Sequence, residues 1–447
     1  MLTRVVESGS MTAKAVLIGV IVLLLLVPLA MLRGVLSERS TLREVAYQRV
    51  AEGWGGNLTF SGPMLVVPIE REILVDNKVR LGRSEMYILP ARLDINADVN
   101  VEAEPRKVGI YGVPVYLSAL RMRGEFDLRQ LQTFVDTQGV TYLWAQSRLR
   151  LPVSTAKSLR EVTQAQFAGQ HVTLGPAGPG VHPAVEAQID MSELRNQTTG
   201  EFAFDAVIAG SRNVSVLPLG NVTTVNMRSN WPHPSFQGAF LPAEHKIGEQ
   251  GFEARWQVLE LNRPYRTIWE AGEVDEAMLS QSSFGVGLFQ SVDIYQRAER
   301  AVKYAVLFIA LTFLTLFAWE QVTRNRLHPL QYLLVGLALS MFYLLLIALS
   351  EHIAFVVAYV VAAASLVLLI GIYIAGALRS SRRGLMAGGA MGVIYGLLYM
   401  LVLSEDYSLL LGAIILFVAL AAVMLATRRF DWYQPRHIDQ TGGEPSN

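Results

Sequence analysis

The sequence predicts an integral membrane protein with six transmembrane α-helices, arranged as one plus five, and a large, mainly antiparallel β domain inserted after the first helix. Three observations predict this fold class: six apolar stretches of spanning length, a long interval that has none, and alternating apolar and polar residues within that interval. Composition agrees, because charged residues make up 17% of the chain, whereas soluble domains usually carry about 25%.

The six apolar stretches approach or exceed the roughly 20 residues that a membrane-spanning helix needs, and backbone groups in hydrocarbon must be satisfied within the segment. The first follows Arg4 and Lys14, as a signal peptide would. It ends without a small-x-small cleavage site, so we expect an uncleaved anchor. The stretches are Ala15–Leu32, Ala301–Trp319, Pro329–Leu349, Ile353–Leu378, Gly384–Leu403 and Tyr407–Thr427.

Basic residues in the short loops predict that both termini are cytoplasmic, in a bacterial-type inner membrane. The two short outside loops then carry Glu351 and Glu405-Asp406, and no Lys or Arg. This topology predicts a cytoplasmic segment and anchor over 1–36, a periplasmic β-rich domain over 37–300, a five-helix bundle over 301–427 and a cytoplasmic tail over 428–447. The basic residues then lying inside are Arg4, Lys14, Arg324, Arg326, Arg379, Arg382, Arg383, Arg428, Arg429 and Arg436.

Alternation with a period of two predicts β-strands in the large domain. Glu201–Ile208, for example, places Phe202, Phe204, Ala206 and Ile208 on one side. Short helices are expected at residues 37–52 and 273–280, and a loop at 169–183. The other alternating runs are Lys107–Leu120, Asn213–Met227 and Gly251–Leu261.

Motifs that would carry chemistry are missing from the sequence. There is no cysteine, which excludes disulfides, thiol catalysis and cysteine-type metal sites. The seven histidines form no metal-ligand spacing, and no nucleophile elbow, phosphate loop or dinucleotide fingerprint is present. Lys+Arg equals Asp+Glu, so no global charge favours nucleic acid. We therefore expect a protein that is not an enzyme, with no cofactor, no metal and no nucleic-acid partner.

One segment outside the membrane is a candidate interaction loop, in which two prolines flank His233 and stiffen the backbone. Trp231, Phe236 and Phe240 either form an exposed aromatic surface for a partner or plug the end of a β-sheet core. The plug is the favoured interpretation of the loop taken alone.

Within the membrane, Gly384, Gly388, Gly392 and Gly396 recur at a spacing of four, and so do Gly336 and Ser340. Small residues at this spacing let two helices approach closely. We expect packing faces here, with a lipid or substrate groove as the alternative. A leucine in place of Gly392 should then cost more stability than Leu398→Ala.

Longer motifs resemble the CreD family of cell envelope integrity inner membrane proteins. They run from Arg326-Leu327-His328-Pro329-Leu330-Gln331-Tyr332 through Ser350-Glu351-His352, and include Ser229-Asn230-Trp231-Pro232-His233-Pro234-Ser235-Phe236, Leu411-Gly412 and Asp431-Trp432-Tyr433. The resemblance implies a link to envelope stress, colicin tolerance and β-lactam response. It implies no catalytic residues.

Two functions remain possible in addition to that of a membrane enzyme. The preferred one is a non-enzymatic protein of envelope integrity and envelope stress response, acting through an unknown periplasmic or inner-membrane protein or envelope component, with the lipid bilayer around its helices. The alternative is a transporter or flippase of a lipid-linked or small envelope molecule, which the five-helix bundle with small-residue faces would suit.

Overall fold

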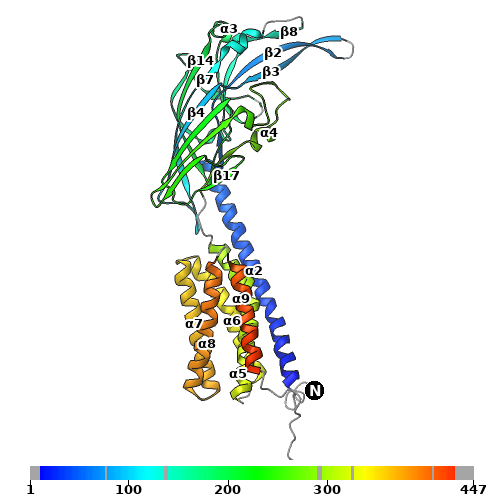
Figure 1. The fold of residues 1–447 in the computed structure, drawn as a ribbon, viewed down its shortest axis with the longest axis vertical. Coiled ribbons are helices and arrows are strands. Elements are labelled where there is room, and N and C mark those ends of the chain that lie inside the picture. The colour runs from blue at the N-terminus through cyan, green and yellow to red at the C-terminus, as the bar shows by residue number, and fades with distance from the viewer. Residues whose placement is uncertain are drawn as a thin grey trace, which may run out of the picture. The chain divides into compact units, whose positions relative to one another are not determined.

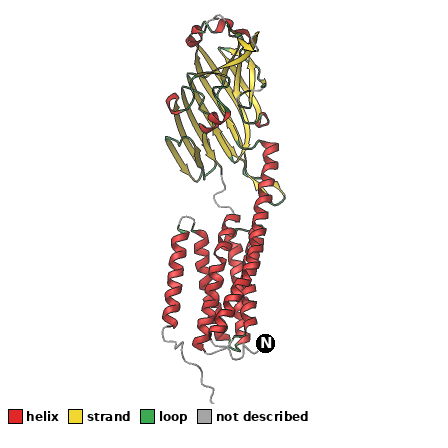
Figure 2. Ribbon diagram, turned by 90° about the vertical axis from the view of Figure 1, so that its right-hand side faces the viewer, coloured by secondary structure: helices red, strands yellow, loops and turns green. Residues whose placement is uncertain are grey.

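The computed structural model describes residues 11–75, 78–134, 139–178, 180, 182–288, 294–323, 327–404 and 407–427. The chain divides into two compact units, one made of Met1–Thr41 with Val292–Asn447 and the other of Leu42–Ser291. The expected tail at 428–447 lies outside the described residues. Figures 1 and 2 show a helical unit and a strand-rich unit.

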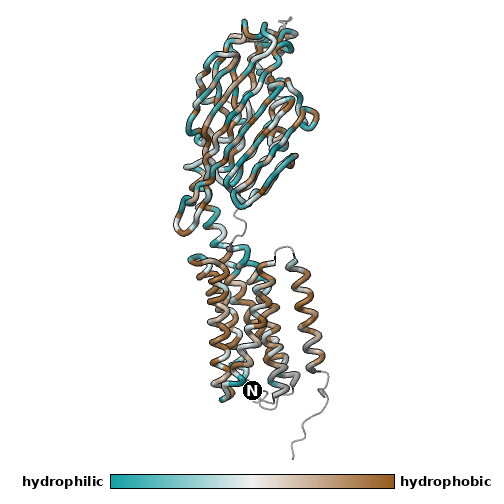
Figure 3. The backbone as a smooth tube through the Cα atoms, turned by 60° about the vertical axis from the view of Figure 1, so that its left-hand side comes forward, coloured by the Kyte–Doolittle hydropathy of each residue, from teal (hydrophilic) through white to brown (hydrophobic). Residues whose placement is uncertain are grey.

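Five helices are long and apolar enough to cross a membrane, and they coincide with the first five predicted stretches. Figure 3 shows apolar residues along these helices. The sixth stretch is also helical, and its apolar part within the described residues is the shorter Leu410–Ala421. The helices are α2 (Met11–Trp54), α5 (Ile294–Thr323), α6 (Pro329–Ser350), α7 (Phe355–Ala377), α8 (Ser381–Leu403) and α9 (Ser408–Thr427).

The helix predicted at residues 37–52 is present, but as a continuation of α2 past the expected end of the anchor and not as a short helix of its own. The reason is local, because neither glycine nor proline interrupts residues 35–52. Pro28 lies inside the helix, which a membrane-spanning helix tolerates. The second expected short helix is present as α4 (Glu276–Gln281).

The membrane part of α2 packs against the other helices through one face. Its buried residues recur every three or four positions, as one stripe of an α-helix does. They join the same apolar core as α5, α6, α7 and α8, and they are Ile21, Leu25, Leu29, Leu32 and Leu36. The predicted anchor is therefore an integral part of the helical unit.

The β-rich unit contains three larger sheets within the described residues. Their strand orders are β11-β10-β14-β7-β4-β16-β19-β18, β12-β13-β9-β2-β3-β20 with β8 on β2, and β1-β15-β21-β17. Strands β5 and β6 form a hairpin of their own. All pairs are antiparallel except β1 with β15 and β4 with β16. This confirms the predicted fold class, a mainly antiparallel domain inserted after the first helix.

The strands occupy Leu58–Phe60 (β1), Met64–Val75 (β2), Lys78–Ile88 (β3), Arg92–Val101 (β4), Arg106–Val108 (β5), Tyr111–Val113 (β6), Val115–Asp127 (β7), Val140–Tyr142 (β8), Arg148–Pro152 (β9), Leu159–Phe167 (β10), Gln170–His171 (β11), Gly175–Pro176 (β12), Ala184–Gln188 (β13), Thr199–Ser211 (β14), Asn213–Val216 (β15), Val222–Ser229 (β16), Ser235–Gly238 (β17), Glu244–Gly248 (β18), Gly251–Leu259 (β19), Ile268–Glu270 (β20) and Phe284–Gly287 (β21). Short helical turns lie at η1 (Leu128–Thr133), η2 (Trp144–Gln146), η3 (Ala156–Ser158), α3 (Met191–Leu194) and η4 (Glu260–Asn262).

Alternation along the strands decides which face is buried. On β14, Phe202 and Phe204 point into the main apolar core, whereas Glu201 and Asp205 point outward. On β2 both faces are buried, because Leu65 joins the main core and neighbouring residues join a second, smaller one. On the eight-stranded sheet, the residues that alternate with the core residues point outward and form a broad polar face.

Candidate functional site

A transverse row of polar residues crosses the outward face of the eight-stranded sheet. Strand register places one polar residue of each of seven adjacent strands in line. From β10 to β18 the polar row consists of Gln164, Asp205, Arg121, Asn96, Asn226, Arg255 and Glu244. These strands lie far apart in the sequence, so the row exists only in the folded sheet.

At the centre of the polar row two amides meet between two cations. Asn226 Nδ2 donates to Asn96 Oδ1 over 3.1 Å. Arg121 and Arg255 flank this pair, and neither has an ion-pair partner in the part of the chain that the structure describes. Neighbouring strands are about 4.8 Å apart, so the two backbones stand about 14 Å from each other. The arrangement offers two guanidinium groups and an amide pair to a polar or anionic partner.

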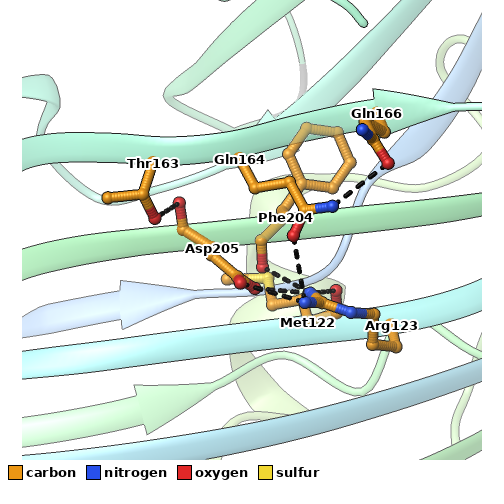
Figure 4. Close-up of polar contacts among 7 residues, drawn as sticks. All are labelled: Met122, Arg123, Thr163, Gln164, Gln166, Phe204 and Asp205. Atoms are coloured by element: carbon orange, nitrogen blue, oxygen red, sulfur yellow. Dashed lines mark hydrogen bonds and ion pairs between the residues drawn. The ribbon is translucent and has the colours of Figure 1, made fainter. Parts of the chain in front are cut away.

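Some other charges on this face neutralise one another. Arg123 pairs with Asp205, and its Nη2 also donates to Gln164 Oε1 over 3.2 Å (Figure 4). The carboxylate of Asp205 raises the pKa of the Arg123 guanidinium. Arg228 Nη2 similarly lies 2.8 Å from Asp98 Oδ2. These pairs fix side chains around the polar row and leave Arg121 and Arg255 as its open donors.

The aromatic residues of the predicted interaction loop pack against the main core. Trp231, Phe236 and Phe240 are half-buried, while His233 is exposed. Phe236 meets the buried Trp256 ring edge-on, with ring centroids 5.8 Å apart. This placement supports the interpretation of the loop as a core plug.

Polar contacts hold the same loop on its strand neighbours. The side chain of Asn230 forms two hydrogen bonds with the backbone of Val101. Val101 N donates to Asn230 Oδ1 over 2.8 Å, and Asn230 Nδ2 donates to Val101 O over 3.0 Å. Trp231 Nε1 donates to the backbone oxygen of His233 over 3.0 Å. A loop held this way closes the sheet end and exposes little aromatic surface.

In the helical unit, an ion pair joins the amino-terminal part of α2 to α5. Lys14 pairs with Glu320, and its Nζ also donates to Leu327 O over 2.8 Å. The Tyr332 hydroxyl donates to Glu320 Oε2 over 2.8 Å, and Glu320 is only 6% exposed. A buried carboxylate needs such partners, because an unpaired charge is costly away from water. We call Lys14, Glu320, Leu327 and Tyr332 the first clamp.

A second clamp holds α2 further along. Arg39 Nε lies 3.6 Å from Glu351 Oε1, and the Tyr295 hydroxyl donates to the same oxygen over 3.2 Å. At about 1.5 Å per residue, Lys14 and Arg39 stand about 37 Å apart along the helix. This span approaches the about 40 Å of a bilayer with its interfaces. The two clamps therefore hold α2 at two points that are separated by about the thickness of a bilayer.

The longest motif of the resemblance contributes residues to both clamps. His328 caps α6, since its Nδ1 accepts from Leu330 N over 3.2 Å and its backbone N donates to Gln331 Oε1 over 2.8 Å. Pro329 occupies the first turn, where a missing N–H costs nothing. Leu327 and Tyr332 then contribute to the first clamp, and Glu351 contributes to the second.

The predicted glycine faces divide into contacting and open positions. Gly384 and Gly388 are buried and lie against α7 near Gly371. Gly392 and Gly396 are exposed and have open space around them, so the prediction that all four pack was wrong for these two. A spacing of four exceeds the 3.6-residue turn, so each step drifts about 40° around the helix. Over three steps the stripe leaves the contact with α7.

Of the other two predicted small residues, Gly336 lies where α2 packs against α6. A Cβ at Gly336 would meet Leu25 Cδ1 at 2.3 Å and Phe313 Cζ at 2.8 Å. Ser340 is buried, and its hydroxyl donates to the Gly336 oxygen over 3.2 Å, within its own helix. Because Gly336 has no side chain, the buried face of α2 can pack directly against α6 at this position.

A family model described as Inner membrane protein CreD matches residues 10–433. The chain belongs to the CreD family. It is also 35% identical over 431 residues to Inner membrane protein CreD of Escherichia coli (strain K12), which covers 92% of this chain and 91% of that relative. The resemblance drawn from the motifs is confirmed, and the CreD family is a family of inner membrane proteins and not a known enzyme family.

Sequence reasoning did not find the polar row or the clamps. The sequence analysis used Lys14 only as a topology signal. One usable signal was present, because a carboxylate next to an apolar stretch needs a buried cation or donor. Among the described residues, no group of three or more His, Asp or Glu side chains could hold a metal ion.

Proposed function

We propose that this member of the CreD family is a non-enzymatic protein of cell envelope integrity and envelope stress response. Its β-rich unit lies in the periplasm, and both termini are cytoplasmic. The unit acts by contacting a periplasmic or inner-membrane partner, or another envelope component. The helical unit holds it at the membrane. Responses to colicins and β-lactams follow from that contact.

The observation that carries the proposal is the polar row. It crosses seven strands, and its central cations, Arg121 and Arg255, are not paired with a carboxylate within the described chain. Such a surface suits recognition of a polar or anionic partner, because guanidinium groups bind carboxylate and phosphate with two parallel hydrogen bonds. Arginine is also over-represented among the residues that dominate interface energetics.

The test is a comparison of two double variants in a strain that lacks the chromosomal copy. Arg121→Ala/Arg255→Ala removes the open cations of the polar row. The control, Arg80→Ala/Lys107→Ala, removes two exposed cations elsewhere in the β-rich unit. We expect the first variant, at normal abundance, to lose tolerance to envelope stress, and the control to keep it.

A photo-crosslinking residue in place of Asn96 should capture a partner in cells, and the adduct should disappear in the Arg121→Ala/Arg255→Ala background. Retention of both adduct and phenotype in that background would show that the polar row is not the contact surface. Equal loss in the control would assign the effect to total charge.

A further inference from the structure

A hydrogen-bonded turn that follows β19 presents a leucine to the solvent. Leu261, the middle residue of η4, is 93% exposed. The polar side chains on either side of it bond to nearby backbone groups. Glu260 Oε1 accepts from Thr267 N over 3.2 Å, and Asn262 Oδ1 accepts from Leu259 N over 3.0 Å. The turn therefore uses its polar side chains internally and leaves its apolar side chain outside, which reverses the ordinary arrangement.

A buried arginine holds this turn in place. Arg263 is only 7% exposed, and its Nη1 donates to Tyr265 O over 3.2 Å while its Nη2 donates to Asn221 Oδ1 over 3.3 Å. Glu260 N donates to Asn221 O over 2.7 Å, which fastens the turn to the loop before β16. The backbone of Leu261 is thus fixed before any partner binds, so little conformational entropy would be lost on docking.

Two more apolar residues lie at the same end of the eight-stranded sheet. Leu259 ends β19 and is 40% exposed, and strand register places it directly opposite the half-buried Val222 of β16. Both lie on the outward face, the one that carries Arg255. Four residues along β19 separate Arg255 from Leu259, a distance of about 14 Å. We call Val222, Leu259 and Leu261 the apolar corner.

We propose that the apolar corner and the open cations of the polar row form one docking surface for a folded protein. This inference rests on the proposed function and narrows its partner from any envelope component to a protein. The partner offers an apolar pocket to Leu261 and carboxylates to Arg255 and Arg121. A standard interface of about 800 Å² on each partner covers such a distance.

The charges around Arg255 favour a protein over an anionic lipid surface. The exposed carboxylates of Glu244 and Glu253 lie beside Arg255, one opposite it on β18 and the other two residues before it on β19. An anionic lipid surface would repel both carboxylates. An anionic glycan would bind the cations, but its hydroxyl-covered surface would leave Leu261 without an apolar contact. Charges of both signs beside exposed apolar side chains match the polar rim and apolar core of a protein–protein interface.

The test uses the full-length protein in cells, with a photo-crosslinking residue in place of Gln257, which points outward on β19. We expect an adduct that protease digests and that has the same mass as the adduct formed from Asn96. Leu259→Ser/Leu261→Ser should lower its yield by at least about ten-fold, as expected when leucine side chains no longer contribute to an interface. The matched control is Leu81→Ser, which changes a leucine that is 70% exposed on β3 and should leave the yield unchanged.

Thermal melting in detergent checks that each variant is folded. We expect melting like that of the wild type, because the changed side chains are exposed. If the double variant melts at a lower temperature, Leu261→Ser alone carries the test, since that side chain is almost fully in solvent.

An undiminished adduct in the leucine variant would overturn the inference. If the same adduct is lost in Arg121→Ala/Arg255→Ala, the proposed function would still stand. An adduct that lipid extraction removes and protease leaves intact would assign the corner to lipid, and an equal loss in the control would assign the effect to surface apolarity in general. No adduct at either crosslinking position, with envelope tolerance retained in the arginine variant, would remove the proposed function and this inference with it.

Discussion

At Gly336 a single hydrogen in place of a side chain decides how closely α2 can approach α6. Replacing this glycine with leucine should force Leu25 and Phe313 apart, since a Cβ already meets their atoms at 2.3 and 2.8 Å. Overpacking of this kind typically costs about 1–3 kcal/mol. Thermal melting in detergent measures the loss.

The same substitution at Gly392 is the natural control, because that glycine faces open space. It should change stability by less than about 0.5 kcal/mol, as at other exposed positions. Leu398 is fully buried, so Leu398→Ala should cost about 2–5 kcal/mol. This order reverses the one predicted from sequence. Equal losses for Gly336→Leu and Gly392→Leu would mean that the Gly392 face is covered in the folded protein.

Alanine substitutions at Trp231 and at the nearby His233 compare the stability contributed by a half-buried and by an exposed side chain. Trp231→Ala should destabilise the β-rich unit by about 2 kcal/mol, below the about 3–5 kcal/mol of a fully buried aromatic, because Trp231 is half-buried. His233→Ala, which removes an exposed side chain, should be nearly neutral. Chemical denaturation followed by tryptophan fluorescence reports both. Normal stability of Trp231→Ala with a lost envelope phenotype would instead support the interaction-surface interpretation.

Among the helices, the first clamp makes a prediction about a buried charge. Glu320→Gln should cost about 3 kcal/mol, because it leaves Lys14 without its carboxylate in a site that is mostly shielded from water. Glu299→Gln on the same helix changes an exposed residue and should be silent. The measurement is melting temperature in detergent. The double variant Lys14→Met/Glu320→Leu should recover part of the loss, and a loss equal to the sum of the Lys14→Met and Glu320→Leu losses would show that the two side chains do not interact.

Asp127, at the end of β7, gives a prediction about pH. It accepts from Arg129 N over 3.2 Å and from Arg129 Nε over 2.8 Å, and these hydrogen bonds hold the pKa of its carboxyl below the ordinary 3.8. A lowered folded-state pKa means that the stabilisation is complete above about pH 4 and disappears as the pH falls through the folded value. Asp127→Asn should therefore lower stability at pH 7 but not at the acid end. Denaturation between pH 7 and pH 3 tests this, and parallel curves for the two proteins would contradict it.

These elements show why the helices were predictable and their contacts were not. An apolar stretch of spanning length specifies a helix by itself, whereas the contact of Gly384 with α7 and the drift of Gly396 away from it depend on helix geometry and neighbours. Strand alternation likewise predicted β14 and β19. It could not predict that Asn96 would stand between Arg121 and Asn226, because sheet order joins strands that are distant in sequence.

For the whole molecule, the charge pattern predicts on which side of the membrane each exposed segment lies. The loop charges predict that the β-rich unit is periplasmic and that the loop between α7 and α8 is cytoplasmic. Because the chain contains no cysteine, a single introduced thiol reports on one position without background. Leu241 in the β-rich unit and Ser381 at the start of α8 are both exposed, so either can be replaced without disturbing a core.

A membrane-impermeant maleimide added to cells with a permeabilised outer membrane and an intact inner membrane should label Leu241→Cys and leave Ser381→Cys unlabelled until the cells are lysed. Labelling after lysis is the internal control for reactivity of the second site. The reverse pattern would place the β-rich unit in the cytoplasm and would remove the basis for periplasmic recognition by Arg121 and Arg255. Labelling of both sites before lysis would require an even number of crossings between them, so that α5, α6 or α7 would not span as the charge pattern predicts.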